Sequence, residues 1–154
     1  MNTYGKNFRF SIFGESHGYC IGCTIDGLPA GFVPDFDFVR RELKRRSPGA
    51  YIGSTARRER DEYKVISGMY NGRTTGMPLT VIFPNNDVDS SPYINNIARP
   101  GHAHFAAYRK YHGYNDPRGG GAFSGRLTAA LVFAGAIAKQ ILSKSGIEVI
   151  SHVA

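Results

Sequence analysis

The sequence has 154 residues, of which 42% are hydrophobic and 20% charged, the size and composition of one ordinary globular domain. Its N-terminus, MNTYGKNFRFSIFGESHG, lacks the apolar core of a signal peptide, and its longest apolar run, residues 127–138, is too short to span a bilayer. We therefore expect a cytoplasmic protein without a membrane partner and without a domain boundary between residues 1 and 154.

The net charge of +7 predicts anionic partners. Arginine supplies 13 of the 19 basic residues, and its planar guanidinium favours bidentate binding of phosphate or carboxylate. A nucleic acid would also explain the pI near 9.6, but the basic residues form no long run and no known nucleic-acid-binding motif. The charge therefore favours a small anionic ligand and leaves a nucleic acid as the weaker alternative.

The first predicted elements are strands over residues 8–13 and 19–26, joined by the sequence GESHG at 14–18. This tight connection holds Ser16 and His17 at a strand end, where catalytic residues are often found. Exposed turn residues without a function explain the same two side chains equally well. Cys20 and Cys23, three apart on the second strand, point to opposite faces, so we expect two buried, reduced thiols.

Asp35 is a predicted N-cap for a helix through about residue 44, and the basic residues 44–46 suit its C-terminus. Strands are predicted over residues 63–70 and 79–83. The polar loop at 84–92 offers Asn85, Asp87 and Asp89 as calcium ligands, but it lacks the glycine and the terminal glutamate of an EF-hand loop. No metal site is predicted.

Residues 99–128, RPGHAHFAAYRKYHGYNDPRGGGAFSGRLT, combine two histidines two positions apart, five basic residues and three consecutive glycines. Arginines bind oxyanions, histidines transfer protons near neutral pH, and glycines let the backbone approach a ligand. A short helix is predicted over 102–112, a core helix that is apolar almost all round over 124–144, and a last strand over 147–150. Residues 119–126 would then form an anion site at the start of the core helix.

Together these motifs resemble the chorismate synthase family. The matching stretches are GESHG, the RRSPG loop with Thr55, Arg57, Glu59 and Asp61, SGMYNGRTTGMP, RPGHAHF, KYHGYNDPRGGG and FSGRLTAALVFAGAIAKQIL. The resemblance implies an α+β fold, a β-α-β sandwich with core helices between antiparallel sheets, of which this chain is the N-terminal part. It also implies a homotetramer.

The reaction implied by this resemblance is an anti 1,4-elimination of phosphate from 5-enolpyruvylshikimate 3-phosphate, giving chorismate for aromatic amino acid biosynthesis. Such an enzyme is a carbon–oxygen lyase that needs reduced FMN, with NADPH or an external reductase as the source of reduction. Because the family's chains are longer, we expect this chain to be inactive alone. Two rival functions stay open, a non-catalytic phosphate- or flavin-binding module and a basic nucleic-acid-binding domain.

The resemblance also assigns roles to residues. His17 would protonate the departing phosphate, and His102 would supply the proton that keeps the reduced flavin in its working ionisation state. The implied substrate ligands are Ser16, Arg46, Arg99, Ser124, Gly125 and Arg126, and the implied FMN contacts are Arg46, His102, Ala122, Phe123 and Ser124. Six residues depart from the family pattern, namely Ile52, His104, Ala122, Phe123, Gly125 and Leu127, and His104 stands in place of an aspartate without an assigned role.

Overall fold

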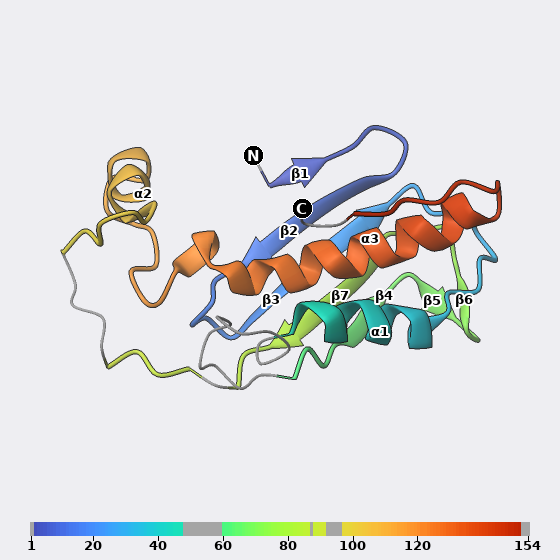
Figure 1. The fold of residues 1–154 in the computed structure, drawn as a ribbon, viewed down its shortest axis with the longest axis horizontal. Helices are drawn as coiled ribbons and strands as arrows, with labels where there is room; N and C mark the ends of the chain where they lie inside the picture. Colours follow the sequence, from blue (N-terminus) through green and yellow to red (C-terminus); the bar gives the residue numbers. More distant parts are fainter. Residues whose placement is uncertain (1, 48–59, 87, 92–96, 152–154) are drawn as a thin grey trace.

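The computed structural model describes residues 2–47, 60–86, 88–91 and 97–151. Its main feature is an antiparallel sheet in the order β1-β2-β3-β7-β4, with two helices on one face (Figure 1). The strands are β1 (Thr3–Tyr4), β2 (Arg9–Gly14), β3 (Cys20–Asp26), β7 (Leu79–Pro84) and β4 (Lys64–Ser67). The helices on that face are α1 (Phe36–Arg46) and α3 (Thr128–Ser143). The predicted α+β class is confirmed.

Strands β3 and β7 form the centre of the sheet because alternate side chains of both are apolar. Cys23 pairs with Ile12 of β2 on one side and with Val81 of β7 on the other. All three lie on the face that the helices cover, as expected from the two-residue period of a strand. The predicted strands at 8–13, 19–26 and 79–83 are confirmed, within one residue at each end.

The two cysteines differ in burial. Cys23 is fully buried, whereas Cys20, the first residue of β3, is half-buried, and both thiols are free. The prediction of two buried thiols is therefore correct only for Cys23. The strand end leaves the Cys20 side chain without the neighbours that enclose Cys23.

Helix α1 begins where the sequence predicted and runs two residues further. The Asp35 carboxylate accepts a hydrogen bond from the Phe38 N–H at 2.9 Å and so caps the first turn. Gln140 of α3 then fixes this cap, since its amide accepts from the Asp35 N–H at 2.7 Å and donates to the Asp35 carbonyl at 3.1 Å. The start of α1 is thus attached to the last turn of α3.

The single strand predicted over residues 63–70 is wrong, because the chain breaks at Gly68. This residue has φ +85°, and a Cβ there would lie 2.5 Å from the Leu79 Cα, so only glycine allows the two segments to pack this closely. The residues after the break form β5 (Met69–Tyr70), which pairs with β6 (Arg73–Thr74) in a small separate sheet. This hairpin lies at the end of the molecule opposite α2 (His104–Lys110) (Figure 1).

The elements after residue 100 are shorter than predicted. Two 3₁₀ turns, η1 (Gly121–Phe123) and η2 (Gly125–Leu127), precede α3, which therefore begins at Thr128 rather than at residue 124. Helix α2 is shorter at both ends than the predicted 102–112. No strand forms at 147–150 within the described part of the chain, because the Ile147 N–H closes the end of α3 on the Leu142 carbonyl at 3.2 Å.

Helix α3 is buried on one side only. Phe133 is fully buried, with its ring 5.0 Å from that of Tyr63, whereas Leu131 is 37% exposed. The prediction of a buried core helix is therefore confirmed for the face that packs on the sheet, and the opposite face is partly exposed. The segment Gly125–Ser143 is long and apolar enough to cross a membrane by length and composition, with 44% of its most apolar window buried in the fold. Its contacts with β3 and β7 are those of a core helix.

Candidate active site

The turn between β2 and β3 holds Ser16 against the triple-glycine segment. Ser16 is 1% exposed; its N–H donates to the Gly121 carbonyl at 3.1 Å, and its hydroxyl accepts from the Gly120 N–H at 3.2 Å. These bonds join two motifs that lie more than a hundred residues apart in the sequence. Ser16 is therefore not an exposed turn residue.

His17 packs on the same glycine segment. A Cβ built on Gly119 would lie 2.5 Å from the His17 Cδ2 and 2.8 Å from the Ser16 Oγ, and Gly119 itself has φ +58°. Only glycine fits here, both because of the space and because of the backbone conformation. The other side of the His17 ring is held through Nδ1, which lies 2.9 Å from the Ser90 hydroxyl.

Arg99 connects this region to a pair of histidines. Its Nη2 lies 3.3 Å from Nε2 of His102 and 3.4 Å from Nε2 of His104, and it also donates to the Gly119 carbonyl. The two imidazole rings meet edge to face at 4.4 Å. Burial, followed by the Arg99 charge, lowers the pKa of both histidines below the ordinary value of 6.5.

The His102 ring has a buried nitrogen without a partner. A guanidinium can only donate, so the His102 Nε2 facing Arg99 accepts and the proton of the neutral ring is on Nδ1. This Nδ1 is buried and has no hydrogen-bond partner within the described residues. An unpaired buried N–H is costly, and a ligand acceptor placed there would remove the cost.

Arg46, Asp61 and Arg126 form a buried charged cluster, and their side chains are 14%, 2% and 3% exposed. Asp61 accepts from the Arg46 Nε at 3.0 Å and Nη2 at 3.2 Å, from the Ser47 hydroxyl at 2.7 Å, and from the Arg126 Nη1. Two guanidinium groups thus share one carboxylate next to η2 (Gly125–Leu127). Buried charges are tolerated when they are paired in this way.

The remaining nitrogens of the two arginines also donate to the protein. The Arg126 Nε donates to the Asn85 Oδ1 and its Nη2 to the Pro84 carbonyl, both at 3.2 Å. The Arg46 Nη1 lies 3.3 Å from the Gly125 carbonyl and 3.1 Å from the Thr128 hydroxyl. Both arginine side chains therefore hold separate segments of the protein together. Their binding of a substrate anion stays a prediction.

The predicted cofactor tripeptide lies at the surface between the triple glycine and α3. Ala122 and Phe123 are exposed, whereas the Ser124 hydroxyl accepts from the Arg126 N–H at 3.2 Å and so caps η2. A Cβ on Gly125 would meet nothing within 4 Å, which places open space beside it. A flat ligand could reach the backbone here, next to Gly119 and Gly120.

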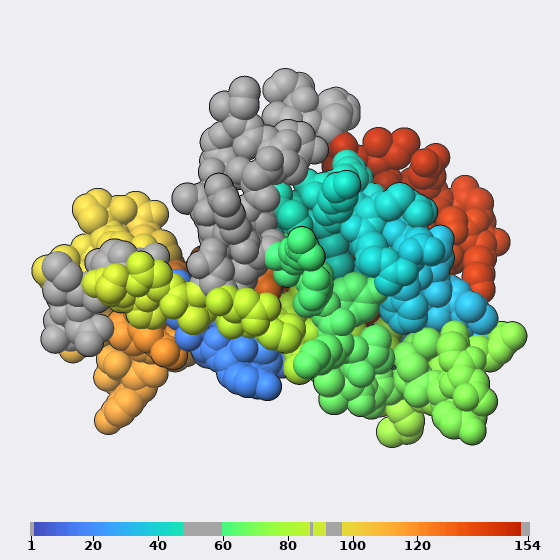
Figure 2. Space-filling view, turned by 90° about the horizontal axis from the view of Figure 1, so that it is seen from below, coloured from blue at the N-terminus to red at the C-terminus, as the bar shows by residue number. Residues whose placement is uncertain are grey.

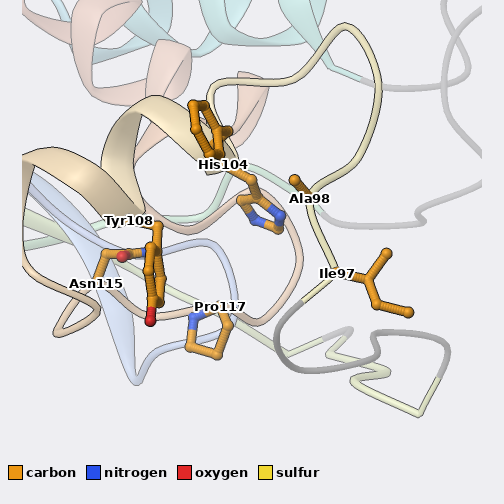
Figure 3. A pocket seen from close by; sticks show the side chains of 7 residues that line it. Ile97, Ala98, His104, Tyr108, Asn115 and Pro117 are labelled. Atoms are coloured by element: carbon orange, nitrogen blue, oxygen red, sulfur yellow. The ribbon is translucent and has the colours of Figure 1, made fainter.

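A pocket of about 290 Å³ opens on the α2 side of the histidine pair (Figure 3). In it the Oδ1 of Asn115 is buried without a hydrogen-bond partner within the described ranges. The walls are formed by Ile97, Ala98, His104, Phe105, Tyr108, Asn115 and Pro117. His104, which departs from the family pattern, therefore has a definite place, between Arg99 and this pocket. The tripeptide Ala122–Ser124 does not line it.

Two residues of this region, Asp61 and Asn85, were not predicted to have a role in the site. Asp61 belongs to a stretch that matches the family pattern, but no role was assigned to it. Asn85 was considered only as a calcium ligand, whereas its side chain binds Arg126 and the Glu15–Gly18 turn. Within the described residues no group of three metal-ligating side chains is found. The departure at Ile52 lies outside the described residues.

The comparisons with known proteins agree with the motifs. A model of the family described as "Chorismate synthase" matches residues 8–154. The chain belongs to the chorismate synthase family. Its fold also matches a solved structure described as "Crystal Structure of Chorismate Synthase", with a TM-score of 0.68 and 29% identity, over 93% of this chain and 36% of that one.

Curated relatives support the same membership. A chorismate synthase of Dehalococcoides mccartyi is 48% identical over 155 residues, covering 99% of this chain and 43% of the relative. One of Thermococcus kodakarensis is 51% identical over 151 residues, covering 97% of this chain and 42% of the relative. The chain therefore spans less than half the length of the family members it matches.

Proposed function

We propose that this chain contributes Ser16, His17, Arg99 and His102 to an enzyme that converts 5-enolpyruvylshikimate 3-phosphate to chorismate. The observation that carries the proposal is the position of Gly119. Its Cα packs against the His17 ring, while its carbonyl accepts from Arg99, which also reaches His102. Two proton-carrying groups and a cation thus converge on one glycine segment, as a phosphate elimination needs.

In this proposal the ring-carbon–oxygen bond to phosphate breaks, the leaving phosphate takes the electron pair, and a proton leaves the opposite face of the ring. His17 protonates the departing phosphate. The Ser90 hydroxyl, 2.9 Å from Nδ1, holds the ring, and in this proposal Nε2 delivers the proton. Arg99, Ser16 and the backbone N–H groups near Gly120 would bind the anionic oxygens, because arginine forks and N–H groups are the donors such oxygens prefer.

The residues fit reduced FMN in part. When bound, FMN would supply electron density transiently, with no net redox change. The unpartnered Nδ1 of His102 offers a buried donor, and the exposed Ala122–Ser124 backbone offers a surface for the ring system. Arg46 fits less well, since all its nitrogens donate to protein oxygens. NADPH as the source of reduction, the homotetramer and the cytoplasmic location belong to the same proposal.

The test is a fusion in which this chain replaces the matching segment of the Thermococcus kodakarensis relative, which is 51% identical to it over 151 aligned residues. With reduced FMN and without oxygen, we expect the fusion to form chorismate and the isolated chain to form none. His17→Ala and His102→Ala should each abolish most turnover while the fusion still binds substrate. Chorismate formation by the chain alone would contradict the expectation that it is inactive without the remainder.

Other outcomes would favour the rival functions. A fusion that binds substrate and flavin but never turns over would indicate a binding module. Oligonucleotide binding by the chain that weakens steeply with salt would indicate a nucleic-acid-binding domain. Absence of such binding at low salt removes that alternative.

A further inference from the structure

We propose that Asn85 is a positioning residue for His17, joining the buried Arg46–Asp61–Arg126 cluster to the turn that carries the histidine. Asn85 follows directly after β7 and lies between these two parts of the molecule. In Figure 2 the segment after β7, drawn in yellow-green, runs beside the blue N-terminal segment. The inference rests on the proposed role of His17 as the acid in the reaction.

Both the nitrogen and the oxygen of the Asn85 side-chain amide form hydrogen bonds. Its Nδ2 donates to the Glu15 carbonyl and to the Gly18 carbonyl, each at 2.9 Å, and its Oδ1 accepts from the Arg126 Nε at 3.2 Å. This orientation of the amide is required by its partners, because carbonyls only accept and a guanidinium only donates. Both Nδ2 hydrogens therefore have an acceptor, and a rotated amide would lose all three bonds.

The two carbonyls that Asn85 binds are the two ends of the histidine turn. The Gly18 N–H donates back to the Glu15 carbonyl at 3.0 Å, so the turn closes on itself around Ser16 and His17. The Asn85 main chain adds a further bond, from its N–H to the Tyr19 carbonyl at 3.2 Å. Asn85 thus fixes the backbone on both sides of His17.

The other end of Asn85 is attached to a rigid group. Arg126 is held by Asp61 and by the Pro84 carbonyl, and Asp61 in turn binds Arg46 at the end of α1. A movement of the turn relative to this cluster has to break a charge-assisted hydrogen bond or an amide–carbonyl pair. Both are strong when buried, so the position of the imidazole depends on Asn85.

Two substitutions separate this role from a general contribution to stability. Asn85→Asp retains an oxygen for Arg126 but presents a carboxylate to the Glu15 and Gly18 carbonyls, which it repels. Asn85→Ala removes both sets of contacts. If Asn85 positions the turn, the two variants should alter His17 alike; if it only stabilises Arg126, Asn85→Asp should resemble the unchanged chain.

The first measurement is the NMR spectrum of the 154-residue chain with labelled histidines, which needs no activity. We expect both variants to shift the His17 signals and to leave those of the distant His112 unchanged, with Asn7→Ala, at an exposed asparagine, as the matched control. Unshifted His17 signals in Asn85→Asp would overturn the inference. Global unfolding of Asn85→Asp would also overturn it, because the residue would then serve stability as a whole.

The second measurement is turnover in the fusion with the Thermococcus segment. Displacing a catalytic group by about 1 Å can cost about a hundredfold in rate, and we expect a loss in kcat of about this size for both variants with an unchanged substrate dissociation constant. A loss confined to substrate binding would contradict the inference. If the unchanged fusion has no activity, the proposed function fails, whereas the NMR result still decides whether Asn85 positions His17.

Discussion

Gly119 lies directly against the imidazole of His17, with its α-carbon so close that a methyl group there would stand 2.5 Å from Cδ2. We expect Gly119→Ala to displace His17 and to strain the backbone, which has φ +58° at this position. The His17 NMR signals should shift, and turnover of the fusion should fall at least about tenfold. Gly135→Ala, on α3 with nothing within 4 Å of the new methyl group, is the matched control and should change neither quantity. Unchanged His17 signals in Gly119→Ala would show that the glycine is not needed for this contact.

Asp61 forms buried ion pairs with two guanidinium groups at once, so its charge should matter for stability. Asp61→Asn removes the charge of the carboxylate that Arg46 and Arg126 both bind, and loss of one partner in a buried ion pair costs about 3–5 kcal/mol. The urea midpoint of the chain should fall accordingly. Glu62→Gln provides the control, since Glu62 is 75% exposed and 4.0 Å from Arg60, where a pair contributes little. Equal midpoints for the two variants would contradict this prediction.

The histidine pair should make stability depend on pH. Burial and the Arg99 charge lower the pKa of His102 and His104 in the folded chain, partly offset at His104 by a hydrogen bond with Gly119. The unfolded chain therefore binds more protons below the ordinary value of 6.5, and stability is lost as the pH falls through this value. Asp89 and Asp116, whose pKa values are also lowered, stabilise the fold above their ordinary value of 3.8, and this stabilisation is lost only as the pH falls below that value.

Urea unfolding at a series of pH values measures this dependence. We expect the free energy of unfolding to rise with pH up to about 6.5 and the slope to diminish in the His102→Gln/His104→Gln variant. His112→Gln is the control, because His112 is an exposed histidine outside this group. A slope that is the same in the double variant and in the unchanged chain would show that the pair is not its source.

The two thiols should differ in reactivity. Burial raises the pKa of Cys23 to about 12, whereas Cys20, with a pKa raised by burial and by the Glu15 charge, is only half-buried. At mildly alkaline pH an aromatic disulfide reagent should label Cys20 slowly and Cys23 only after denaturation, since the thiolate is the reactive form. An internal disulfide is not expected, because residues three apart on a strand are separated by about 10 Å. Equal labelling of both thiols in the folded chain would contradict the described position of Cys23.

Much of the fold was predictable where local patterns carry the information. Alternating apolar residues identified β3 and β7, and Asp35 marked the start of α1. The break at Gly68 was not predictable, because its cause is a contact with Leu79 on another strand. The late start of α3 was not predictable either, because residues 125–127 form the separate 3₁₀ turn η2, which the Ser124 hydroxyl caps.

The motifs that form the site were predictable from the sequence, but the contacts between their residues were not. GESHG and the 99–128 segment were each expected to carry functional residues, and the structure brings them together. Asp61 and Asn85 were missed because they meet Arg126 over sequence separations of 65 and 41 residues, which no local pattern records. The resemblance to the family located Asp61 in a matching stretch, but only its contacts show what it does.

The hydrogen bonds of the site close long loops: Gly120 to Ser16 over 104 residues, His17 to Ser90 over 73, and Asn85 to Glu15 over 70. The β2–β3 hairpin needs only local contacts, so we expect it to form early in folding. The site forms later, because its hydrogen bonds require long loops to close and each closure costs conformational entropy. A partly folded chain with an intact hairpin would therefore have no binding site at all. A ligand of the site therefore binds only the fully folded chain, and its binding free energy stabilises that state relative to partly folded ones.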